Sequence, residues 1–84
     1  MNNDIEEKVV NNLTNKYSKE LIDLMKECNI SDSVIMLSIM GIGTHTAYYR
    51  VLYNRIMNNK EKMNDELAKK LVIELFREID RNEE

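Results

Sequence analysis

The chain has 84 residues, 43% of them hydrophobic and 32% charged, and its net charge at pH 7 is −3. This balance predicts one soluble globular domain spanning residues 1–84, and a strongly basic nucleic-acid binder is excluded. A chain of this size buries only about 60–65% of its unfolded surface, so association with a second copy is an ordinary way to gain stability.

Cysteine, glycine and proline usage narrows the class further. Cys28 is the only cysteine, which excludes an intramolecular disulfide. With no secretory segment at the N-terminus, we expect a reducing, cytoplasmic location. The longest apolar run, residues 34–43, is about half of what a membrane span requires, so no membrane partner is expected. There is no proline and only two glycines, Gly41 and Gly43. So few turn-forming residues favour an all-α fold.

The charges are unevenly distributed along the chain. Residues 1–27 carry six acids and four bases, for −2, and residues 63–84 carry seven acids and four bases, for −3. The segment between them has a charge of +2, from Asp32 and Glu61 against Arg50, Arg55, Lys60 and Lys62. An acidic body with one basic element can still bind DNA, with an affinity that falls as salt is raised.

The first 28 residues carry an apolar stripe at helical spacing. Its members are Ile5, Val9, Val10, Leu13, Tyr17, Leu21, Leu24, Met25 and Cys28. Asn3 is a good N-cap, and Glu6 can complete a capping box. The short polar side chains of residues 11–18 weaken helix propensity. The segment is therefore either one helix over residues 4–28 or two helices that break near residues 15–18, and we favour a break with Ser18 as the second N-cap.

A second apolar segment follows, which Ser31 or Asp32 can cap. It is apolar on nearly all sides, which predicts a buried central helix. Gly41 and Gly43 are expected to end this helix, because glycine tolerates the positive φ that a sharp turn between helices requires. Ile42, between the two glycines, is expected to fill the core beside the turn.

The third predicted helix is capped by Thr44 and ends near Asn58. At about 100° per residue, its predicted buried face consists of Ala47, Tyr48, Val51, Leu52 and Ile56. Its predicted exposed face consists of Thr46, Tyr49, Arg50, Tyr53 and Met57. Arg55 falls within the apolar sector, where it either reaches solvent at the helix end or pairs with an acid.

The last predicted helix runs over residues 65–80, with Asn64 as its N-cap and acids in its first turn. Its stripe consists of Leu67, Ala68, Leu71, Val72, Leu75, Phe76 and Ile79. Taken together, these segments predict an all-α, compact four- to five-helix bundle. The wide apolar face of the last helix either closes the core or forms a dimer interface, and we expect a homodimer that uses the first or the last helix.

The segment over about residues 32–58 carries the most informative motif. In a helix-turn-helix, an apolar residue of the first helix packs on the second helix, a glycine makes the turn, an apolar residue follows, and a small residue lies where the helices cross. These positions are filled here by Leu37, Gly41, Ile42 and Ala47. The sequence therefore predicts a helix-turn-helix in this segment.

The sequence around this turn is Met40-Gly41-Ile42-Gly43, followed after three residues by Ala47-Tyr48. It resembles the phage- and mobile-element-type helix-turn-helix proteins, which often have the sequence Leu-Gly-Ile-Gly-x-x-x-Ala-Tyr at this place. The resemblance covers under a third of the chain. It departs from the family pattern at Arg50, where such proteins usually have an aliphatic residue. The resemblance implies a small phage- or plasmid-borne regulator of transcription that binds double-stranded DNA. At its specific site, such a regulator acts by occlusion or by recruitment.

If the resemblance holds, the second helix of the motif enters the major groove. The residues expected to contact DNA are Thr44, His45, Thr46, Tyr49, Arg50, Tyr53, Lys60 and Lys62. Arg50 is expected to pair with guanine or to hold a phosphate, and the two lysines to contact the backbone. In the alternative interpretation the motif is a plain helical hairpin. The protein is then a small acidic adaptor or inhibitor that binds a host protein through Tyr49, Tyr53 and Met57.

Catalysis is poorly supported by the residue pattern. His45 is the only histidine and has no partnered cysteine, so no metal site is expected. The run Gly41-Ile42-Gly43-Thr44 lacks both the P-loop spacing and the strand and third glycine of a dinucleotide site. Asp23 and Glu27 lie on a helix face that is expected to be solvated. We therefore predict no enzyme and no cofactor.

Overall fold

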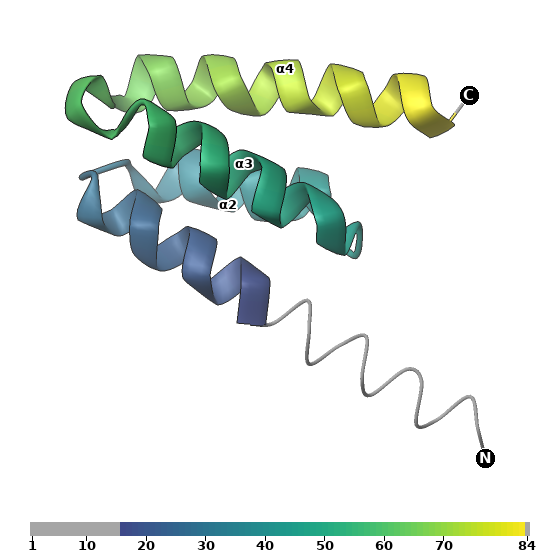
Figure 1. Ribbon diagram of the computed structural model, residues 1–84, viewed down its shortest axis with the longest axis horizontal. Helices are drawn as coiled ribbons and strands as arrows, with labels where there is room; N and C mark the ends of the chain where they lie inside the picture. Colours follow the sequence, from purple (N-terminus) through teal and green to yellow (C-terminus); the bar gives the residue numbers. More distant parts are fainter. Residues whose placement is uncertain (1–15, 84) are drawn as a thin grey trace.

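The computed structural model describes residues 16–83, and every regular element in this range is helical (Figure 1). The chain begins there with a helix over residues 16–27, followed by α2 (Asp32–Ile42) and α3 (Thr46–Asn58). A single 3₁₀ turn (Lys60–Lys62) then leads to α4 (Asp65–Glu83). The predicted all-α fold is confirmed for this range, with four α-helices. The predicted cap at Asn3 and capping box with Glu6 lie outside the described residues.

Helix 16–27 corrects one prediction about the first segment. Residues 16 and 17 are already helical, so Ser18 lies inside the helix and is not its N-cap. The helix ends where Asn29 adopts a φ of 60°. The Asn29 N–H donates to the Lys26 carbonyl and the Ile30 N–H to the Met25 carbonyl, each at 3.0 Å. This pair of bonds is a Schellman motif, and it directs the buried Ile30 into the core.

The α2 helix ends at one of the two glycines and not at both. It continues through Gly41 to Ile42, and only Gly43 leaves the helical conformation, with a φ of 58°. The Gly43 N–H still donates to the Ile39 carbonyl at 2.9 Å. Gly41 has a different role, because a Cβ there would overlap the ring of Phe76 from α4 unless that ring moved. Ile42 is fully buried beside the turn, as predicted.

The turn between α2 and α3 consists of Gly43, Thr44 and His45. The N-cap of α3 is His45, so the prediction of Thr44 as the cap was wrong by one residue. The Thr46 side chain turns back and donates to the Thr44 carbonyl at 3.3 Å. An N-cap carbonyl accepts the first hydrogen bond of its helix. Here the Thr44 carbonyl accepts from Thr46 within the turn, whereas the His45 carbonyl accepts from the Tyr48 N–H at 3.0 Å.

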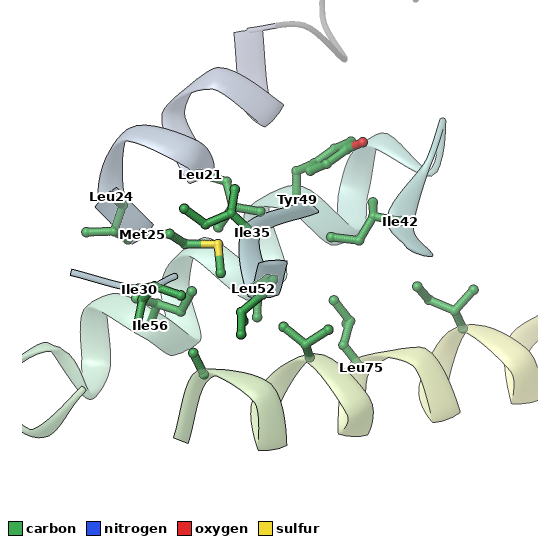
Figure 2. Close-up of a cluster of buried hydrophobic side chains, with 14 residues drawn as sticks. Leu21, Leu24, Met25, Ile30, Ile35, Ile42, Tyr49, Leu52, Ile56 and Leu75 are labelled. Carbon is green, nitrogen blue, oxygen red and sulfur yellow. The ribbon is translucent and has the colours of Figure 1, made fainter. Parts of the chain in front are cut away.

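The core is one cluster of apolar side chains from all four helices, as Figure 2 shows. Its buried members are Leu21, Leu24, Met25, Ile30, Val34, Ile35, Ile42, Tyr49, Leu52, Ile56, Ala68, Val72, Leu75 and Ile79. The last four come from α4 at helical spacing, so the predicted stripe of that helix is confirmed. Phe76 and Leu71 pack at its edge.

The start of α4 is fixed by side-chain hydrogen bonds. Asn64 accepts from the Leu67 N–H at 2.8 Å, which confirms the predicted N-cap. Asp65 accepts from the Ser31 N–H, also at 2.8 Å, and so joins the start of α4 to the start of α2. The helix extends to Glu83, three residues beyond the predicted end.

Candidate functional site

The second helix of the predicted DNA-binding motif is α3, which runs between helix 16–27 and α4 in Figure 1. Its buried face consists of Tyr49, Leu52 and Ile56. The predicted exposed position of Tyr49 is therefore wrong, since only 2% of this residue is accessible. The Tyr49 hydroxyl donates to the Gly43 carbonyl. A tyrosine can be buried when its hydroxyl finds such a partner, and here burial also raises the pKa of that hydroxyl.

Two other residues of the motif are also placed differently from the prediction. Ala47, expected at the helix crossing, is exposed. Leu37, expected to pack against α3, is 39% exposed. The rotation of α3 that buries Tyr49 turns Ala47 outward, because the two residues lie about 200° apart around the helix. The helix pair and its plugged turn are present, but three of the four positions of the motif are not used as predicted, since Gly41 lies inside α2 and Gly43 makes the turn.

Arg50 is held in place by three side chains from its surroundings. Its guanidinium donates to the Glu20 carboxylate at 3.1 Å. The same group lies 5.6 Å from the ring centroids of both Tyr17 and Tyr53. Cation–π contacts and an ion pair together orient a half-exposed arginine. Arg50 is therefore engaged with helix 16–27, and it is not an unpartnered cation on the face of α3.

Two further bases, Arg55 of α3 and Lys60 of its exit, are also paired. Lys60 forms an ion pair with Glu27 of helix 16–27 at 3.1 Å. Arg55 donates two hydrogen bonds to Glu78 of α4, at 2.5 and 3.0 Å. This settles the two alternatives for Arg55 in favour of an acid partner. The hydrogen bond raises the pKa of Arg55 and lowers the pKa of the Glu78 carboxyl.

The remaining predicted contacts lie at the two ends of α3. Thr44 and His45 are exposed in the turn, and the His45 ring meets Tyr48 edge-on. Thr46 is half-buried at the start of the helix, and Lys62 is exposed in the 3₁₀ turn beyond its end. Since α3 has 13 residues, these two groups are about 20 Å apart. The structure therefore brings Arg50 and Tyr53 together, and it separates the threonines and His45 from the lysines.

A groove of about 310 Å³ lies between helix 16–27 and α3. Its lining consists of Glu20, Asp23, Leu24, Glu27, Tyr53, Met57 and Lys60. We call it the acidic groove, because three carboxylates from one face of helix 16–27 line it beside Leu24, Tyr53 and Met57. The sequence carried a signal for it, since residues 20, 23 and 27 recur at helical spacing. For Asp23 and Glu27 the sequence predicted only a solvated helix face.

A second groove, of about 430 Å³, lies between helix 16–27 and α2. It is lined by Ile22, Lys26, Asp32, Ile35, Met36, Ile39 and Met40, and we call it the α2 groove. Met36 is 59% exposed and Met40 is 76% exposed. The prediction that α2 is buried on nearly all sides is therefore wrong. The helix lies at the surface of the bundle because helix 16–27, α3 and α4 cover only part of it.

The described residues form a small all-α bundle with a groove on each of two sides of helix 16–27. Within residues 16–83, no three His, Cys, Asp or Glu side chains are grouped so that they could hold a metal ion. In the same range no helix is long and apolar enough to cross a membrane. No family model, curated protein or solved structure matches the chain.

Proposed function

We propose that this protein is a small acidic helical adaptor or inhibitor that binds another protein through the acidic groove. The proposal rests mainly on the pairing of the α3 bases with carboxylates of the flanking helices. Because of that pairing, the surface beside α3 is a groove with both carboxylates and apolar side chains in its lining, and not a basic ridge. The partner suited to it is a basic protein segment that carries an apolar anchor residue.

The floor of the groove supports this choice of partner. Leu24 closes the bottom, Tyr53 forms one wall, and Met57 is 43% exposed. Aromatic residues and methionine are enriched where proteins contact each other, and methionine adapts its shape to different side chains. An incoming apolar side chain would cover Met57, while a flanking lysine or arginine would face Asp23. The chain's net charge of −3 also attracts a basic partner to the protein.

The same contacts make DNA a less suitable ligand for α3. A phosphate that approached Arg50 or Lys60 would have to replace Glu20 or Glu27. These carboxylates would remain nearby and repel it. The helix also lies between two neighbours that carry acids toward it, which limits how deeply it can enter a groove of DNA. The DNA-binding regulator remains a prediction, and the geometry favours a protein ligand over it.

The proposal can be tested with a photo-crosslinking residue at position 57 in the full-length protein, expressed in cells. The matched control carries the same residue at position 73 on α4, where Ile73 is 38% exposed, close to the 43% of Met57. We expect a protein crosslink at position 57 that is absent at position 73. The additional change Asp23→Lys should weaken this crosslink by reversing one rim charge.

A DNA-retardation assay with the purified protein, run at low and high salt, completes the test. The proposal expects no retardation of duplex DNA at low salt. Retardation that weakens steeply with salt and is lost in Arg50→Ala, together with no protein crosslink at position 57, would overturn it in favour of the DNA-binding regulator. Circular dichroism of Arg50→Ala and Asp23→Lys checks that both variants remain folded.

A further inference from the structure

We infer that the α2 groove binds a second copy of this chain, so that the protein is a symmetric dimer. Its edge is formed by the two methionines of α2 that are more than half exposed, Met36 and Met40. Its floor is formed by isoleucines, including the half-buried Ile22 and Ile39. A partner seated in this groove would remove these exposed apolar side chains from water together. The thin core of an 84-residue chain gains stability when such a surface is covered.

The charges at the rim of the groove identify a second copy as the occupant. Lys26 lies in the last turn of helix 16–27, and Asp32 is the first residue of α2. Both are exposed at the same end of the groove, on opposite walls. A two-fold axis along the groove exchanges the two walls. Lys26 of each copy then faces Asp32 of the other, so the rim is complementary to itself.

The same rotation also matches the apolar parts. It places α2 of one copy against helix 16–27 of the other, so that Met36 and Met40 cover Ile22 of the second copy. Methionine suits this role because its unbranched side chain fills irregular gaps. The rim carries one charge of each sign, so the net charge of −3 does not concentrate repulsion at this surface. The dimer is therefore favoured by apolar burial and oriented by two symmetric ion pairs.

A dimer of this kind leaves both acidic grooves open. Residues 22 and 26 of helix 16–27 face the α2 groove, whereas residues 20, 23 and 27 face the acidic groove. The two grooves therefore use different sides of one helix. The dimer does not depend on the proposed function, and it would give the protein two partner-binding grooves.

Sedimentation equilibrium of the full-length chain over a concentration series tests the dimer, with Met40→Glu as the disrupting variant. Its matched control is Ile73→Glu on α4, another exposed apolar position. We expect the wild type to dimerise, Ile73→Glu to dimerise equally well, and Met40→Glu to raise the dimer Kd at least about a hundredfold. A wild type that stays monomeric up to about 1 mM overturns the inference, as does an equal effect of both variants.

Charge exchange tests the orientation of the two copies. Lys26→Glu and Asp32→Lys should each weaken dimerisation about tenfold, because each brings like charges together at two symmetric contacts. A mixture of the two variants restores opposite charges at both contacts, so it should form a heterodimer as tight as the wild-type dimer. If the mixture associates no better than either variant alone, this arrangement is wrong. Thermal melts of both variants confirm that they are folded.

Discussion

Gly41→Ala is expected to destabilise the protein, although alanine is the better helix former. Gly41 lies inside α2, where the exchange of glycine for alanine ordinarily stabilises a helix by about 1 kcal/mol. At this position, however, the added Cβ would overlap the ring of Phe76 from α4. The substitution therefore sets a local preference of the sequence against a contact made by the tertiary structure.

The size of the effect follows from these two opposing contributions. The half-buried Phe76 ring must tilt away from α2, or the two helices must separate. Overpacking of this kind costs about 1–3 kcal/mol. After the gain in helix propensity is subtracted, a net loss of up to about 2 kcal/mol remains. For a chain of this size, that loss lowers Tm by up to roughly 15 °C.

Thermal and urea unfolding, followed by circular dichroism, measure this loss. The control repeats Gly41→Ala in a Phe76→Ala background, where the ring is absent and the same change should stabilise by about 1 kcal/mol. The double-mutant cycle should give a coupling of about 1–3 kcal/mol between the two positions, equal to the cost of the overpacking. If Gly41→Ala raises Tm when Phe76 is present, the ring does not constrain position 41 and the reasoning is refuted.

Three further substitutions test contacts within the bundle. Tyr49→Phe removes the hydrogen bond to the Gly43 carbonyl, so unfolding in urea should show a loss of about 0.5–1.5 kcal/mol, and an unchanged midpoint would contradict that bond. Asn64→Ala removes the N-cap of α4 and should cost about 1 kcal/mol in the same assay. The lowered folded-state pKa of Glu78 means that its pairing with Arg55 stabilises the protein above the unfolded pKa of about 4.3 and is lost as pH falls through the folded pKa. The Tm of Glu78→Gln should therefore fall less than that of the wild type on acidification from about pH 6 to pH 3, and parallel pH profiles would count against the pairing.

The features that sequence alone predicted well are those set by neighbouring residues. The turn after Ile42 follows from a glycine that can adopt a positive φ, and the start of α4 follows from an asparagine that caps its own helix. The stripe of α4 follows from a periodicity that only one face of a helix can satisfy. Each of these depends on interactions within a few residues along the chain.

The character of α3 and its surroundings could not be predicted in this way. Arg50, Lys60 and Arg55 find their carboxylates 30, 33 and 23 residues away, in helices whose positions no local pattern specifies. The same is true of Gly41, whose role depends on a ring of α4. From the sequence alone, Arg50 and Lys60 were expected to be free to contact DNA, because the acids that pair with them lie far away in the chain.

The sequence by itself determined an all-α chain, the turn between α2 and α3, and the apolar faces of its helices, because these follow from backbone preferences and helical periodicity. The tertiary structure decided which way α3 is rotated, and with it the burial of Tyr49. It also decided which charges neutralise each other and which apolar surface of α2 stays exposed. These features depend on how the four helices pack around a small core. That packing is set by contacts between residues far apart in the chain.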